Sequence, residues 1–304
     1  MTSQRKCRLF LVDAFTRNRF CGNPAAVVLD ADVLRDDEMR RIARELGGTE
    51  VAYVFPSDSP DYDVEIRFFS PRRREVTFIG HATIAAHYVR AMVDGVPKGK
   101  VRQKSPSGIV EVEICGDAPN LRVSIEQTPA TFGPVVPDER IGPVLDALGI
   151  SSATLHPSCP VQVMSKANSR LIIGLQSPET LASLQPKMEQ LIHLTPHVGA
   201  DGFFVFALNP GSKPTSTESR MFCPVLGVPE DPVSGNAHGM LGVYLLHNGL
   251  LAAKDGVSSF VGHQGRFVDR PGQVEVQVAS SGKRATNVRV TGDAVIVYEA
   301  SIPL

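Results

Sequence analysis

Hydrophobic and polar positions alternate over several short stretches in the first half of the chain, a pattern that predicts strands. The predicted strands are Arg8–Asp13, Ala25–Leu29, Val51–Phe55, Val64–Phe69, Ile109–Ile114 and Leu121–Ile125. Apolar residues at helical spacing predict two helices, one over Asp36–Leu46 that ends at Gly47-Gly48, and one from His81 to Val93. Helices therefore interrupt the strands only sparsely.

The second half repeats this order after the Pro-rich stretch Thr128–Pro137, which we interpret as a linker. Helices are expected at Ile141–Leu148, Pro178–Leu191 and Ala237–Asn248. Strands are expected at Val161–Val163, Leu171–Leu175, Phe203–Leu208 and Met221–Phe222, with closing strands near Gln273–Val278, Asn287–Thr291 and Ala294–Tyr298.

Two segments of the chain are similar enough to be copies of one unit. R-F-F-S-P at Arg67–Pro71 matches R-M-F-C-P at Arg220–Pro224, and G-H-A-T at Gly80–Thr83 matches G-N-A-H at Gly235–His238. Upstream, Gly47–Phe55 is similar to Gly199–Phe206. In this alignment Glu50 falls opposite Gly202, and His81 falls opposite Asn236. A duplicated unit of this size predicts two similar domains that face each other across a cleft.

The expected fold class is α+β, with two pseudo-symmetric lobes in which a curved mixed sheet wraps around a central helix. We expect the first lobe to cover residues 1–127, together with a return strand in 292–304, and the second lobe to cover 128–291. The return strand is expected because the repeat unit is exhausted before Ala294–Tyr298.

Composition narrows the possible classes of partner. The chain has 304 residues, 42% of them hydrophobic, with a net charge of −1. This charge gives no reason to expect nucleic acid or a membrane as partner, and no apolar run is long enough to cross a bilayer. We therefore expect a cytoplasmic protein. The five cysteines form no C-x-x-C pair, which favours reduced thiols.

Two glycine turns are candidate anion sites. Gly80-His81 and Gly235-Asn236 each open an apolar helix, where free N–H groups and the helix dipole attract a carboxylate. The alternative is ordinary helix capping, in which Gly and Asn are common. The matched places of the two turns in the repeat favour a site, and we expect both helix starts to face one cleft.

Two acidic positions are candidates for proton transfer. Glu50 lies at a loop-to-strand junction, where partial burial would raise its pKa, although most such acids are simply solvated. Glu230-Asp231-Pro232 is either a proline turn or a carboxylate aimed at the cleft. We interpret His87, His238 and His247 as packing or surface residues, and Arg72-Arg73-Arg74 as a solvated turn. The sequence contains no H-x-x-x-H with a following acid, no Cys/His cluster and no nucleotide-binding glycine motif, and His193/His197 is interrupted by Pro196.

Five motifs in order resemble the phenazine-biosynthesis PhzF-like isomerase family, nearly end to end. They are V-D-A-F-T (Val12–Thr16), G-N-P-A-A-V (Gly22–Val27, containing Asn23), the Glu50 segment, G-H-A-T (Gly80–Thr83) and E-D-P-V-S-G-N-A (Glu230–Ala237). The resemblance implies the two-lobed fold of diaminopimelate epimerase and an isomerase without cofactor or metal. It also implies that Glu50 is the acid that moves the proton, and that His81 and Asp231 flank the substrate.

The chain departs from the family at positions that bear on the substrate and the mechanism. Asn236 stands where phenazine members carry a serine. Ile79 and Ser234 precede the two glycines, where the epimerase relatives carry cysteines. Racemisation needs an acid or base on both faces of a carbon, whereas the repeat offers a clear acid on one lobe.

Three functions stay open at this point. The first is a cofactor-independent isomerase of a small carboxylate, with Glu50 as acid/base in the interdomain cleft and Asn23, Gly80, Gly235 and Asn236 binding the substrate. The second is an epimerase or racemase that uses Glu50 against Asp231. The third is a metabolite-binding or interaction protein without turnover. The resemblance suggests a homodimer.

Overall fold

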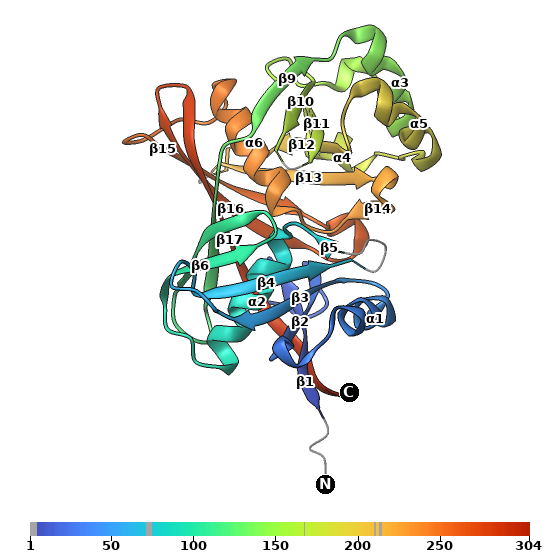
Figure 1. The fold of residues 1–304 in the computed structure, drawn as a ribbon. Coiled ribbons are helices and arrows are strands. Elements are labelled where there is room, and N and C mark those ends of the chain that lie inside the picture. Colours follow the sequence, from blue (N-terminus) through green and yellow to red (C-terminus); the bar gives the residue numbers. More distant parts are fainter. Residues whose placement is uncertain (1–4, 71–74, 167, 210, 213–214) are drawn as a thin grey trace. The chain divides into compact units, whose positions relative to one another are not determined.

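The computed structural model describes residues 5–70, 75–166, 168–209, 211–212 and 215–304. The chain divides into two compact units (Figure 1). Unit 1 contains Met1–Glu126 and Thr291–Leu304, and unit 2 contains Gln127–Val290. Within the described ranges, no helix is both long and apolar enough to cross a bilayer.

Unit 1 is built on a mixed sheet. Strand β1 (Lys6–Ala14) pairs antiparallel with β2 (Asn23–Leu29) and with the end of the last strand of the chain, β17 (Arg284–Pro303). β2 runs parallel to β3 (Glu50–Pro56), which pairs antiparallel with β4 (Val64–Phe69). The remaining strands are β5 (Glu75–Val76), β6 (Gly99–Ser105), β7 (Gly108–Cys115) and β8 (Arg122–Gln127).

Helices cover both faces of this sheet. α2 (Gly80–Val93) packs on β1, β2 and β3 and is buried from Ala82 to Val89, so it is the central helix of the unit. α1 (Asp36–Leu46) is amphipathic and buries Met39 and Ala43 against the other face of the sheet, among Ala26, Val28, Val51, Tyr53 and Phe69. The extended strands alternate between these two apolar layers, as a sheet covered on both faces requires.

Unit 2 has the same plan. Its strands are β9 (Thr131–Val135), β10 (Gln162–Ser165), β11 (Ser169–Leu175), β12 (Phe203–Leu208), β13 (Ser216–Cys223), β14 (Val228–Asp231), β15 (Val257–Gln264) and β16 (Gly272–Ser281). β11 runs parallel to β12, and β12 pairs antiparallel with β13. The central helix is α6 (Gly235–His247), which is buried along nearly its whole length.

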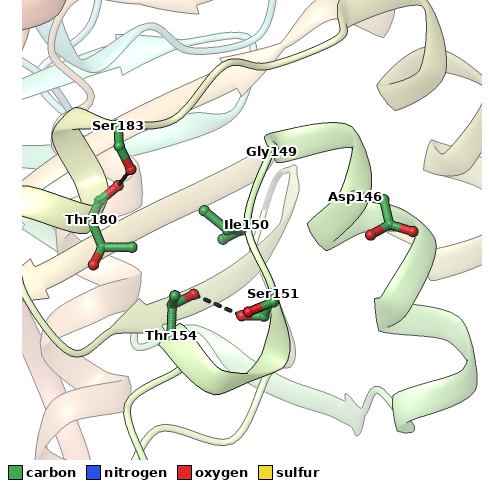
Figure 2. Close-up of a pocket in the computed structure, with 7 residues that line it drawn as sticks. All are labelled: Asp146, Gly149, Ile150, Ser151, Thr154, Thr180 and Ser183. Carbon is green, nitrogen blue, oxygen red and sulfur yellow. Dashed lines mark hydrogen bonds between the residues drawn. The ribbon is translucent and has the colours of Figure 1, made fainter.

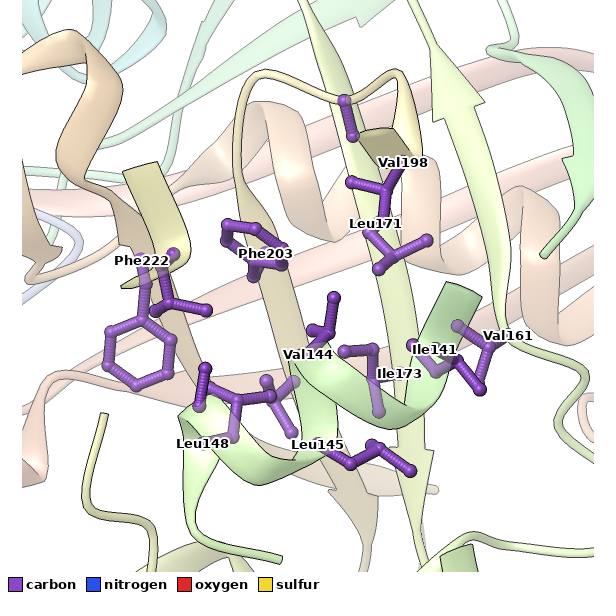
Figure 3. Packing of buried hydrophobic residues seen from close by; sticks show 14 of the residues in the cluster. Ile141, Val144, Leu145, Leu148, Val161, Leu171, Ile173, Val198, Phe203 and Phe222 are labelled. Carbon is purple, nitrogen blue, oxygen red and sulfur yellow. The ribbon is translucent and has the colours of Figure 1, made fainter. Parts of the chain in front are cut away.

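The outer face of the unit 2 sheet carries its own core (Figure 3). α3 (Asp138–Leu148), α4 (Pro178–Ala182) and α5 (Met188–Val198) supply residues that include Val144, Leu145 and Leu148, which pack on strand residues such as Leu171, Ile173 and Phe203. Each unit therefore holds its sheet between a central helix and an outer helical layer.

Strand register confirms the alignment of the two repeats. Val51 pairs with Phe69 and Tyr53 with Arg67 in unit 1, while Phe203 pairs with Phe222 and Val205 with Arg220 in unit 2. Phe68 opposite Val76 corresponds to Met221 opposite Asp231. By the same register, Glu50 and Gly202 both immediately precede the first residue of these ladders.

Several sequence-based boundaries are wrong. The helix expected over Pro178–Leu191 is two helices, because Pro186 cannot donate an N–H and interrupts the pattern between α4 and α5. The linker expected at Thr128–Pro137 contains β9, which pairs with β10. The two closing strands after residue 284 are one strand of 20 residues, β17. The Arg72-Arg73-Arg74 turn lies outside the described residues.

Candidate active site

Glu50 and His81 lie together in unit 1. Glu50 is the first residue of β3, and its side chain is 32% exposed. His81 is the second residue of α2, and its Nε2 lies 3.4 Å from Oε2 of Glu50. Nε2 is buried and has no hydrogen-bond partner among the described residues, so the two groups are close without forming an aligned hydrogen bond. An acid beside an imidazole can pass a proton to a substrate that enters between them.

Asn23 lies close to the same strand ends. It is buried at the start of β2, two residues before Ala25, which pairs with Glu50 in the parallel ladder. The hydroxyl of Thr49 donates to the carbonyl of Pro24 over 2.6 Å and ties the Glu50 loop to the start of β2. β2 therefore positions both Asn23 and Glu50.

The space next to Gly80, the first residue of α2, contains no other protein atoms. A side chain added at Gly80 would meet no atom within 4 Å. The residue before the helix, Ile79, makes no side-chain capping bond. The N–H groups of the first turn lack intrahelical acceptors, so this terminus can bind an anion.

The equivalent segments before the two glycine turns are held by the same ion pair. Arg67 on β4 binds Glu75 on β5 through Nε at 2.8 Å and Nη2 at 3.0 Å. Arg220 on β13 binds Glu230 on β14 through Nε at 2.9 Å and Nη2 at 2.8 Å. Both guanidinium groups lie over a phenylalanine two residues further along the strand, Phe69 and Phe222. Bidentate Arg–Glu pairs of this kind fix the geometry of the strand that leads into each turn.

Asp231 directly follows this pair in unit 2, where unit 1 carries Val76. The buried amide of Gln264 holds the turn between Asp231 and α6, because its Nε2 donates to the Asp231 carbonyl at 2.6 Å and its Oε1 accepts from the Ser234 N–H at 3.2 Å. Gly265 follows with φ 91°, and a side chain there would lie 2.7 Å from the Pro232 carbonyl. Only glycine fits this approach.

The start of α6 differs from the start of α2. Ser234 caps the helix by accepting from the Ala237 N–H at 3.3 Å, and Asn236 lies partly buried in the first turn. His238 is buried beneath the turn, where its Nδ1 donates to the Ser234 carbonyl over 2.7 Å. Burial lowers the pKa of His238 to about 4, so the ring is neutral at pH 7. His238 and the equally buried His87 are packing residues, and His247 is exposed, as predicted.

The two units differ most at the Glu50 position. Its equivalent, Gly202, has no room for a side chain, because an added Cβ would meet Sγ of Cys223 and the carbonyl of Phe222. Unit 2 therefore cannot carry an acid at this position. Of the two equivalent positions, only the one in unit 1 has a carboxyl group, that of Glu50.

A hollow among the described residues lies elsewhere, in unit 2. It has a volume of about 460 Å³ and is lined by residues of the α3–α4 region, such as Asp146, Ser151 and Thr180 (Figure 2). None of the predicted site residues lines it. In the described ranges, no three His, Cys, Asp or Glu residues are grouped as a metal site.

A duplicated sheet-and-helix unit in which one copy places an acid beside a histidine is compatible with proton-transfer chemistry. The family model described as phenazine biosynthesis-like protein, PhzC-PhzF, matches residues 12–300. The chain belongs to this family.

Known relatives agree with this assignment. The uncharacterized isomerase YddE of Escherichia coli is 39% identical over 97% of this chain and 98% of its own. The trans-2,3-dihydro-3-hydroxyanthranilate isomerase of Pseudomonas fluorescens is 27% identical over 97% of this chain and 98% of its own. The solved PhzF-family protein of Bacillus anthracis matches with a TM-score of 0.86 at 25% identity, over 99% of this chain and 100% of its own. The predicted fold class is confirmed, and the chain is an enzyme of this isomerase family.

The sequence analysis did not identify the residues that fix the backbone around the candidate site. Gln264 lies in a strand that the alternation did not reveal, and the Arg220–Glu230 pair was not inferred. The repeat contained a signal for the latter, since Arg67 and Arg220 are aligned and each has a Glu before its glycine turn.

Proposed function

We propose that this enzyme isomerises a small carboxylate by moving one proton with Glu50, without inverting a stereocentre. The observation that carries the proposal is the placement of Glu50 beside His81 in unit 1, 3.4 Å apart, while the equivalent position in unit 2 is Gly202. One acid can remove a proton from one face of a substrate and return it to a neighbouring carbon on that face.

The other predicted residues have supporting roles in this proposal. His81 flanks the substrate, and its Nε2, which has no hydrogen-bond partner among the described residues, is available to orient it beside Glu50. Gly80, Gly235 and Asn236 offer helix-start donors to the substrate carboxylate, while Asn23 and Asp231 bind its polar groups. Residues of both units would thus act on one substrate molecule.

Glu50 has an acid counterpart only if Asp231 reaches the opposite face of the same carbon, which would make the enzyme an epimerase. Asp231 is partly buried and lies next to the rigid Arg220–Glu230 pair, so this second function has a specific residue behind it. The register does not favour it, because Asp231 is equivalent to Val76 and not to Glu50.

Proton transfer in heavy water separates these functions. Small amino and hydroxy carboxylates are first screened for stabilisation on heating, starting with trans-2,3-dihydro-3-hydroxyanthranilate, the compound in the name of the P. fluorescens relative. The stabilising compound is then incubated with enzyme in D₂O. We expect a shifted double bond, with configuration retained at the remaining stereocentre. Inversion would instead identify an epimerase, and binding without exchange would contradict any enzymatic role for this site.

A further inference from the structure

Arg170 lies beside Gly202, the position in unit 2 that is equivalent to Glu50 in unit 1. It is the second residue of β11 (Ser169–Leu175), and Leu171 donates its N–H to the carbonyl of Gly202 over 2.8 Å. A Cβ added at Gly202 would lie 3.4 Å from Cδ of Arg170. Unit 1 therefore has an acid at this strand end, and unit 2 has an arginine on the strand next to the equivalent end.

The guanidinium of Arg170 is buried and largely unpaired. The residue is 5% exposed, and its Nη1 donates to the Ser169 carbonyl over 2.7 Å. Its Nε is buried and has no hydrogen-bond partner among the described residues. A guanidinium has five N–H donors, and burying its charge without a partner is costly.

The second buried arginine of this unit shows what a structural role looks like. Arg220 binds Glu230 through two hydrogen bonds and donates from Nη1 to the Leu184 carbonyl over 3.1 Å. Its charge is matched within the fold, whereas the Nε of Arg170 has no hydrogen-bond partner among the described residues. An anion from outside the chain would supply the missing partner.

Arg170 also lies near the predicted substrate residues of unit 2. The charges of Arg170, Asp231 and Asp201 all act on the pKa of the buried Cys223 thiol. Asp231 pairs with Met221, two residues before Cys223 on β13. Arg170 and Asp231 thus approach the same stretch of β13.

We propose that Arg170 binds the carboxylate of the substrate and makes the enzyme selective for acidic substrates. This inference rests on the proposed function. It assigns a residue of unit 2 to substrate binding.

The test compares Arg170→Met with two control variants. Methionine keeps most of the volume of the arginine stem and removes the charge. Arg140→Met removes an exposed arginine of α3, and Arg220→Met removes the buried arginine that is paired. Binding is measured by calorimetry and by melting temperature with 3-hydroxyanthranilate, with its uncharged carboxamide, and with sodium sulfate.

The expected result has two parts. Arg170→Met should bind 3-hydroxyanthranilate about 10- to 100-fold more weakly than the wild type, the usual worth of a charged hydrogen bond, while carboxamide binding changes little. Its melting temperature without ligand should stay the same or rise, because an unmatched buried charge is removed, whereas that of Arg220→Met should fall. Arg140→Met should resemble the wild type in both measurements.

Three results would overturn the inference. The first is equal binding of 3-hydroxyanthranilate by the wild type and Arg170→Met, and the second is failure of the wild type to bind either 3-hydroxyanthranilate or sulfate. The third is a fall in the melting temperature of Arg170→Met as large as that of Arg220→Met. Binding does not depend on proton transfer. A Glu50 variant that keeps its turnover would therefore defeat the proposed function and leave this binding result standing.

Discussion

His238 is a neutral, fully buried imidazole beneath the start of α6, and its surroundings explain its state. The ring contacts Phe204 edge-on and stacks on Phe260, and Gly262 leaves room for it because an added Cβ would collide with the ring. Nδ1 donates to the carbonyl of the capping residue Ser234. The uncharged ring thus supports the glycine turn that carries Gly235 and Asn236.

The depressed pKa of His238 predicts acid sensitivity. Burial lowers this pKa from 6.5 to about 4, so the unfolded chain takes up a proton more readily than the folded one. The contribution of His238 to stability is therefore complete above about pH 6.5 and is lost as the pH falls towards 4. The loss amounts to about 3 kcal/mol, at 1.36 kcal/mol per pKa unit.

Urea denaturation between pH 7 and pH 4.5 checks this prediction. We expect His238→Asn to be less stable than the wild type at pH 7 but to lose less stability on acidification. His247→Asn, which changes an exposed residue of the same helix, should keep the pH dependence of the wild type. An unchanged pH slope in His238→Asn would contradict the assignment of a neutral buried ring.

The two Arg–Glu pairs allow a matched comparison of buried and exposed charge. The side chains of Arg220 and Glu230 are 9% and 10% exposed, while those of Arg67 and Glu75 are 22% and 33% exposed. Arg220→Met leaves Glu230 buried without a partner and should reduce the free energy of unfolding by about 3–5 kcal/mol. Arg67→Met should cost about 1 kcal/mol or less, because water screens its pair. Equal losses in chemical denaturation would show that burial does not set the strength of these pairs.

At the scale of elements, helix α1 was easier to predict than the strands around it. α1 was predicted with the bounds that it has, Asp36–Leu46, since its amphipathic pattern ends at two glycines. β6 and β15 were missed because several of their buried positions carry polar residues, among them Gln103 and Ser258. Pairing with neighbouring strands, mainly β7 and β16, defines them.

The open start of α2 predicts a separation of binding from stability. At Gly80 an added methyl group meets no protein atom within 4 Å, and the glycine does not have positive φ. Gly80→Ala should therefore leave the melting temperature unchanged or slightly higher. If a ligand approaches the backbone there, the methyl group should weaken its binding by about tenfold or more.

Gly142→Ala in α3 is the control, because its added methyl also meets nothing within 4 Å and no substrate is expected near it. Thermal melts and ligand titrations of both variants test whether Gly80→Ala weakens ligand binding without lowering the melting temperature. Ligand binding by Gly80→Ala at wild-type strength would remove the start of α2 from the proposed anion site.

At the scale of the whole molecule, the sequence repeat predicted the duplication, and the strand registers of the two units reproduce it. Alignment of the two repeats within the sequence was enough to show that Glu50 and Gly202 are equivalent, and the strand registers agree with that alignment. The partners of Arg220, Gln264 and Arg170 depend on which strands lie side by side, which local patterns do not encode. The placement of substrate residues from the two units around one molecule stays a prediction.

The central claim is that Glu50 transfers the proton, and the isosteric Glu50→Gln variant tests it most directly. The amide keeps the shape of the carboxyl but cannot take up or release a proton at neutral pH. Glu45→Gln, a change at an exposed position of α1, serves as the control. Turnover is measured on the substrate identified by the screen, and ligand affinity is measured on the same preparations. We predict that Glu50→Gln binds ligand nearly as well as wild type and loses turnover by about 10²-fold or more, whereas Glu45→Gln keeps both. Turnover of Glu50→Gln near the wild-type rate would contradict the claim.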